Sequence, residues 1–179
     1  TTSTSTTFNV TVNAVNDAPT VANAPANVSE EGLPSGVPDT TGTPGDTTNS
    51  TTASGTITVA DVDSAIASVT LTAPTAALTS GGQAVTWSGV GTQALTGTAN
   101  GQTVATLTID NSGAYNFTLL KPIDHPVAGA EDVRALNFGV VASDGTSAGA
   151  GTLTISVEDD APAPITPITE TLAIQSTNL

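Results

Sequence analysis

The stretch GTLTISVEDDAP (151–162) alternates apolar and polar residues and then runs into three acids closed by Ala-Pro. Alternation with a period of two predicts a β-strand with one buried face, and the proline ends it. The stretch FNVTVNAVNDAP (8–19) follows the same pattern, with Asp17 in the place of Asp160. Two copies of one motif, a strand followed by an acidic junction, indicate tandem repeats joined by acidic linkers that proline stiffens.

This repeat divides the chain into three parts. We expect residues 1–15 to be the last strand of a preceding repeat and residues 16–160 to be one complete repeat. Residues 161–179 are expected to begin the next repeat. The sequence contains no methionine, which predicts that it is a piece of a longer protein.

The same alternation recurs throughout the central unit. Turn signals follow several of the alternating segments, notably DNSG (110–113) and Asp144-Gly145. Residues 32–53 show no periodic apolar face, which predicts a long exposed loop. Short strands at this spacing predict an all-β sandwich without a regular helix. The other predicted strands are 54–60, 67–73, 83–89, 103–109, 114–120 and 136–142.

The charge balance limits the kinds of partner that the chain can bind. Sixteen acidic residues face only Lys121 and Arg134, giving a net charge of −14. Such a chain suits cations, and it argues against nucleic acid and against an anionic membrane surface. Cysteine is absent, which excludes a disulfide framework, and no apolar run is long enough to span a membrane.

The acids fall into two groups once the predicted strands are placed alternately up and down a sandwich. Crowded carboxylates repel one another, and a hard divalent cation such as Ca²⁺, which takes 6–8 oxygen ligands, would neutralise them. At the end where the chain enters, the expected metal ligands are Asn16, Asp17, Asp61, Asp63 and Asp144. At the end where it leaves, they are Glu30 or Glu31, Glu131, Asp132, Asp159 and Asp160, with Asp124 and Glu158 in the same group.

These positions resemble those of cadherin-type repeats, which bind calcium between successive domains. In those repeats the calcium ligands come from a linker Asn-Asp, which matches Asn16-Asp17, and from a D-x-D turn, which matches Asp61 and Asp63. They also come from a Glu early in the first strand, which matches Glu30 or Glu31, and from an Asp in a late hairpin, which matches Asp144. The chain is still more similar to the tandem repeats of giant bacterial RTX adhesins. That likeness rests on YNFTLLKPIDHP (115–126), SDG (143–145) and GTLTISVEDDAP (151–162). The turn DVDSA (61–65) lacks the Gly-Asp continuation common in such repeats.

The resemblance implies an Ig-like or cadherin-like Greek-key β-sandwich. It also implies a Gram-negative, extracellular adhesin exported by type I secretion and active in adhesion and biofilm formation. In that setting the chain would be a spacer, with Ca²⁺ as its cofactor and neighbouring repeats as its partners. No direct membrane insertion is expected.

Two other classes of function compete with the spacer. An enzyme is not expected, because no sequence motif marks a nucleophile that could act with His125, the single histidine. We interpret His125 as a loop residue. A module that binds a sugar or peptide is the alternative. Trp87 would then be a stacking platform, although its alternation with polar neighbours favours a place in the core.

Overall fold

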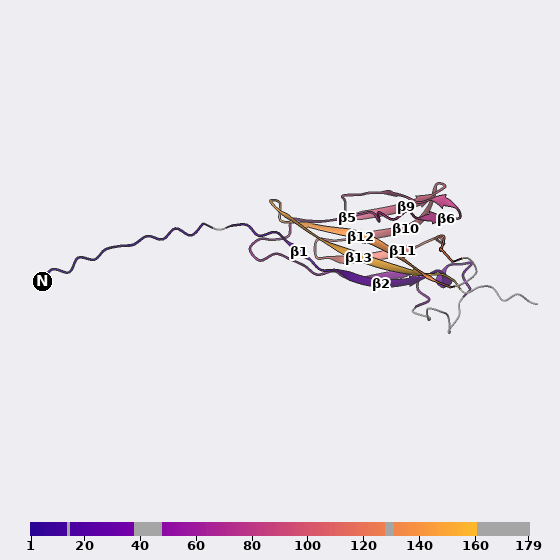
Figure 1. The fold of residues 1–179 in the computed structure, drawn as a ribbon, viewed down its shortest axis with the longest axis horizontal. Helices are drawn as coiled ribbons and strands as arrows, with labels where there is room; N and C mark the ends of the chain where they lie inside the picture. Colours follow the sequence, from indigo (N-terminus) through magenta and orange to yellow (C-terminus); the bar gives the residue numbers. More distant parts are fainter. Residues whose placement is uncertain (14, 38–47, 128–130, 161–179) are drawn as a thin grey trace, which may run out of the picture.

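The computed structural model describes residues 1–13, 15–37, 48–127 and 131–160, and nearly all of its regular structure is β-strand (Figure 1). The predicted start of a next repeat, 161–179, and the middle of the predicted loop, 38–47, lie outside the described residues. A single 3₁₀ turn, η1 (Glu30–Gly32), follows the second strand. The strands are β1 (Thr20–Val21), β2 (Ala24–Ser29), β3 (Thr52–Thr56), β4 (Val59–Ala60), β5 (Ser68–Thr72), β6 (Thr79–Ser80), β7 (Gln83–Ala84), β8 (Thr86–Ser88), β9 (Ala94–Ala99), β10 (Gln102–Ile109), β11 (Ala114–Leu119), β12 (Val133–Ser143) and β13 (Ala148–Glu158).

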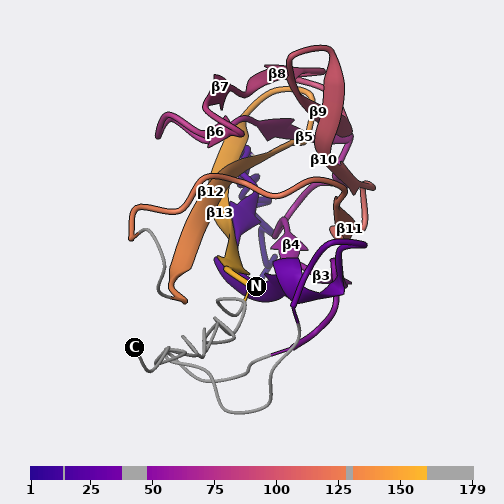
Figure 2. The same ribbon diagram turned by 90° about the vertical axis from the view of Figure 1, so that its right-hand side faces the viewer.

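Two sheets form the body of the molecule. One has the strand order β2-β13-β12-β5, and the other has the order β3-β11-β10-β9-β8. Figure 2 shows β12 and β13 on one side and β3, β10 and β11 on the other. The chain crosses between the sheets from β2 to β3, from β3 to β5, from β5 to β8 and from β11 to β12, which is Greek-key connectivity. The predicted all-β sandwich is therefore confirmed.

Aliphatic side chains and two phenylalanines fill the space between the sheets. Phe117 from β11 and Phe138 from β12 are fully buried, with ring centroids 6.0 Å apart. Leu153 and Ile155 show how the alternation of β13 works, because both are fully buried while Thr154 between them is not. Truncating a core phenylalanine of this kind to alanine typically costs about 3–5 kcal/mol.

Three predicted strands differ from the structure. The stretch 54–60 is split into β3 and β4, because β3 pairs with β11 whereas β4 pairs with β1. The stretch 83–89 is likewise split into β7 and β8. The described part of 8–15 forms no strand and is exposed, since none of the strands in the described part of the chain pairs with it.

The courses of β2 and β13 define two ends of the sandwich. β2 runs parallel to β13, so Ala24 faces Leu153 at one end of the ladder and Ser29 faces Glu158 at the other. The chain therefore enters the sandwich at one end and leaves at the opposite end (Figure 1). We call these ends the N-terminal pole and the C-terminal pole. Among the described residues, no helix has the length and apolar character needed to cross a bilayer.

Candidate metal-binding poles

The N-terminal pole brings together three segments that are far apart in the sequence: the linker before β1, the turn after β4 and the β12–β13 hairpin. The Asn16 amide donates to Asp144 Oδ2 at 2.8 Å and to Ser147 Oγ at 3.0 Å. The backbone N–H of Asp17 donates to Asp63 Oδ2 at 3.3 Å. The linker is thus tied to both loops by polar contacts.

Local backbone contacts shape the two loops of this pole. Asp61 Oδ1 accepts from the N–H groups of Asp63 (3.0 Å) and Ser64 (2.9 Å), which closes the D-x-D turn. Asp144 Oδ1 accepts from the N–H groups of Thr146 (2.6 Å) and Ser147 (2.7 Å). These hydrogen bonds, joined by that from Asn16, lower the pKa of Asp144.

One oxygen of the N-terminal pole stands out. Asp61 Oδ2 is buried and has no hydrogen-bond partner among the described residues. A buried carboxylate oxygen normally accepts a hydrogen bond or binds a cation, because leaving it without either is costly. All the side-chain ligands predicted here carry oxygen, which is the donor chemistry that Ca²⁺ prefers.

The C-terminal pole holds carboxylates that are removed from water. Glu30, Glu31 and Glu158 are 3%, 5% and 1% exposed. Glu158 ends β13 and pairs in register with Ser29 of β2, whose hydroxyl caps η1 by accepting from the N–H of Glu31 at 3.1 Å. The turn of η1 thus brings two glutamates against the end of the last strand.

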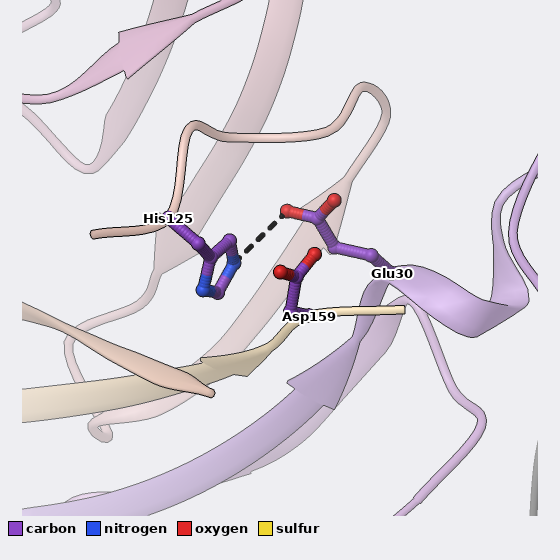
Figure 3. A group of neighbouring side chains, drawn as sticks. All are labelled: Glu30, His125 and Asp159. Atoms are coloured by element: carbon purple, nitrogen blue, oxygen red, sulfur yellow. Dashed lines mark ion pairs between the residues drawn. The ribbon is translucent and has the colours of Figure 1, made fainter. Parts of the chain in front are cut away.

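His125 lies in the middle of this pole, from the loop between β11 and β12. Its Nδ1 is hydrogen-bonded to Asp132 Oδ1, and its Nε2 lies 3.3 Å from Glu30 Oε1. Ligand atoms of Glu30, His125 and Asp159 all lie within 4.8 Å of one another (Figure 3). The sequence-based interpretation of His125 as a plain loop residue missed this arrangement, in which its side chain is only 3% exposed.

Burial is the largest influence on the ionisation of Glu30 and Asp159. Desolvation raises the pKa of Glu30, although the nearby imidazole and the Ile123 N–H, which donates to Oε1 at 2.8 Å, oppose it. Desolvation likewise raises the pKa of Asp159, against the pull of His125. Both shifts disfavour the charged form, so a cation at this pole would lower the cost of keeping these groups ionised.

Asp124 turns away from the acidic group. Its Oδ2 accepts from the N–H of Gly82 at 2.8 Å, and hydrogen bonds from Thr79 and the β6–β7 turn lower its pKa. Arg134 donates to the backbone carbonyls of Asp124 and Ala77. Asp124 therefore fixes the β6–β7 hairpin to the loop before His125.

The remaining predicted ligands lie near the same pole. Asp159 follows β13, and its N–H donates to the carbonyl of Asp132 at 2.9 Å. Asp160 is half-buried next to it, and its N–H donates to Asp159 Oδ1 at 3.0 Å. Glu131 is half-buried just before β12. The structure thus gathers the predicted residues at two poles.

A shallow hollow of about 480 Å³ lies beside the β6–β7 and β9–β10 hairpins, and Asp124 is the one member of the two predicted acidic groups that lines it. Trp87 does not line it. The indole packs edge-on against Phe138, with ring centroids 5.2 Å apart, which agrees with a place in the core. The polar side chains that line the hollow are Ser80, Gln83, Asn100, Gln102, Lys121 and Asp124.

Comparison with protein-family models, with curated proteins and with solved structures found no match to this chain.

Proposed function

We propose that this chain is a calcium-stiffened spacer repeat of an extracellular bacterial adhesin that acts in adhesion and biofilm formation. The observation that carries the proposal is the N-terminal pole. Three distant segments converge there on oxygen-bearing side chains, and Asp61 Oδ2 is buried without a hydrogen-bond partner among the described residues. The residues that would hold Ca²⁺ there are Asn16, Asp17, Asp61, Asp63 and Asp144.

The repeat in the sequence supports neighbouring repeats as the partners. Asn16 and Asp17 correspond to Asp159 and Asp160 in the second copy of the junction. In a tandem array the C-terminal pole of one unit would therefore meet the N-terminal pole of the next. Bound Ca²⁺ would offset the repulsion between the two acidic groups and stiffen the linker.

The location and the type of protein rest on the RTX-adhesin resemblance. Outside the cell, calcium-binding modules typically have dissociation constants of about 10⁻⁴–10⁻³ M. In calcium-poor cytosol the acidic poles would repel one another, which suits a chain that is exported before it folds fully. Export by a type I system would bring it to calcium and so to its stiff form.

Thermal unfolding in calcium and in a chelator tests the proposal. Ligand at roughly 100 times its dissociation constant adds about 2.7 kcal/mol per site, and each kcal/mol raises Tm by about 2–4 °C for a domain of this size. We therefore expect a rise of about 5–10 °C per Ca²⁺ site and a smaller rise with Mg²⁺. The double variant Asp61→Ala/Asp63→Ala should lose most of that rise.

Asp110→Asn is the matched control. This acid belongs to the DNSG turn and contacts neither acidic group, because its Oδ1 accepts from Ser112 and Ala114. The variant should start less stable yet keep the full calcium increment. An unchanged Tm of the wild-type chain in calcium would contradict the proposal.

The hollow favours a second candidate, a module that binds a sugar. Its amide, hydroxyl, amine and carboxylate side chains offer the hydrogen-bonding groups that recognise sugar hydroxyls. Saturable chemical-shift changes at Gln83 and Gln102 on addition of monosaccharides, without a calcium effect on Tm, would favour this candidate over the spacer.

A further inference from the structure

The imidazole of His125 is buried among carboxylates in a way that neither a spacer nor a calcium-bound junction requires. Its side chain is 3% exposed and that of Glu30 is 4% exposed. Nε2 is buried and, among the described residues, has no hydrogen-bond partner. Figure 3 shows this nitrogen directed toward the carboxylate of Glu30, with the carboxylate of Asp159 alongside.

The partners of His125 fix which nitrogen carries a hydrogen. Asp132 accepts on both oxygens, from His125 Nδ1 through Oδ1 and from the N–H of Val127 through Oδ2 at 3.0 Å. Nδ1 is therefore the donor, and Nε2 presents a lone pair in the neutral imidazole. A lone pair that faces a carboxylate oxygen needs a positive species between them, which is either a proton or a metal ion.

The spacing of His125 Nε2 and Glu30 Oε1 fits a small tetrahedral ion, and a carboxylate oxygen of Asp159 lies within 4.8 Å of a ligand atom of each residue. Zinc bonds of about 2.0–2.1 Å to nitrogen and oxygen place neighbouring tetrahedral ligand atoms roughly 3.3–3.4 Å apart. The distance from Nε2 to Glu30 Oε1 is 3.3 Å. Calcium uses longer bonds of about 2.3–2.6 Å and oxygen ligands, so an imidazole donor favours zinc over calcium.

The outer contacts also match those of a metal-bound histidine. A ligating imidazole typically donates its other N–H to a carboxylate, which sets the tautomer and the ring orientation, and Asp132 occupies that position. The ligating carboxylates are normally hydrogen-bonded as well, and the Ile123 N–H donates to Glu30 Oε1.

We propose that Glu30, His125 and Asp159 form a zinc site within a single repeat, with Asp132 as the residue that orients the histidine. Zinc there would join η1, the loop before β12 and the segment after β13. The three protein ligands leave a fourth tetrahedral position to water. The proposal does not depend on calcium binding at the junction, because it needs no neighbouring repeat.

The single histidine makes a direct test practical. Long-range ¹H–¹⁵N NMR of the metal-stripped chain at pH 7.5 reports both ring nitrogens of His125 without overlap. We expect one equivalent of ZnCl₂ to shift the Nε2 resonance to that of a metal-bound nitrogen while Nδ1 keeps its hydrogen. Co²⁺ in place of zinc should give the visible absorption of a tetrahedral complex. An imidazole that keeps both N–H groups in the presence of zinc would overturn the proposal.

Variants separate this site from the proposed calcium sites. Calorimetric titration of His125→Gln should show no zinc binding, whereas its calcium-dependent rise in Tm remains. Asp132→Asn, which keeps an acceptor for Nδ1–H but removes the charge, should weaken zinc binding about 10–100-fold. Asp144→Asn, at the opposite pole, should bind zinc as the wild type does. Equal zinc affinity in His125→Gln and wild type would reject the site.

Discussion

At the scale of single residues, the surroundings of His125 shift the ionisation of its imidazole. Removal from water favours the neutral ring, but the approach of Glu30 and the hydrogen bond to Asp132 outweigh it and raise the pKa of His125 above 6.5. The neighbouring carboxyl groups of Glu30 and Asp159 also have raised pKa values. Each of the three groups therefore holds its proton more tightly in the folded chain than in the unfolded chain.

These shifts predict that the metal-free protein loses stability as the pH rises. The contribution of His125 to the free energy of unfolding is fully present below pH 6.5. It is lost as the pH rises through the raised pKa of His125, because over this range the unfolded state binds fewer protons than the folded state. The two carboxyl groups also lower the stability as the pH rises, Glu30 from pH 4.5 upward and Asp159 from pH 3.8 upward. Urea unfolding in chelator should give a smaller free energy of unfolding at pH 8.5 than at pH 6.5.

Glu30→Gln provides the control for this pH dependence. The glutamine keeps an acceptor for the Ile123 N–H but removes the charge that faces Nε2. NMR titration should therefore give a lower pKa for His125 in the variant than in the wild type. A wild-type chain that became more stable between pH 6.5 and 8.5 would contradict the prediction.

The sequence predicted the convergence of the N-terminal pole better than it predicted the burial of His125. Asp61 and Asp144 follow alternating strands, so counting strand directions places both at one end of a sandwich. The orientation of His125 depends on the path of an irregular loop, which has no period to read. The only signal was its position in the triplet Asp-His-Pro (124–126).

At the scale of elements, the DNSG turn depends on a glycine. Gly113 has φ of +82°, and a Cβ there would lie 2.1 Å from the carbonyl oxygen of Ile57. Gly113→Ala should therefore lower the free energy of unfolding by about 2–4 kcal/mol, since it adds both left-handed strain and a backbone clash. Urea denaturation measures the difference.

Gly101 in the β9–β10 turn is the matched control. Its φ is +73°, but a Cβ would meet nothing within 4 Å. Gly101→Ala should cost only the left-handed strain, about 1–2 kcal/mol. Equal losses in the two variants would mean that the contact between Gly113 and Ile57 contributes nothing.

Most long strands were predicted, whereas short and connecting elements were not. Clear alternation identified β10, β11 and β13, because each buries one face. β9 was missed because its small residues weaken the apolar period. The dipeptide Asn100-Gly101 is a sequence signal for the β9–β10 hairpin, because both residues of such a turn adopt positive φ, as they do in the structure.

At the scale of the whole molecule, the exposed N-terminal segment fits the expected repeat. Val10 and Val12 are 71% and 87% exposed, while their counterparts in the second copy, Leu153 and Ile155, are fully buried in β13. Such apolar alternation needs a partner sheet to bury it. That residues 1–15 belong to a preceding repeat stays a prediction.

The parallel pairing of β2 with β13 determines how the domain bears force. Tension applied through the two chain ends pulls β2 from the N-terminal pole and β13 from the C-terminal pole, along the axes of neighbouring strands. The hydrogen bonds from Ala24–Leu153 to Ser29–Glu158 are then loaded in shear and must break together. The proposed adhesin spacer, anchored at one end and attached at the other, would experience this load in flowing liquid.

Single-molecule pulling can test this consequence, because the absence of cysteine lets introduced cysteines serve as unique handles. Handles at Asp17 and Asp160 should give a high unfolding force. Handles at Asn23 and Thr152, which lie at the same end of the two strands, should peel the ladder open pair by pair at a lower force. Equal forces in the two geometries would contradict a shear-bearing ladder, whereas the expected difference would identify β2 and β13 as the mechanical clamp of the domain.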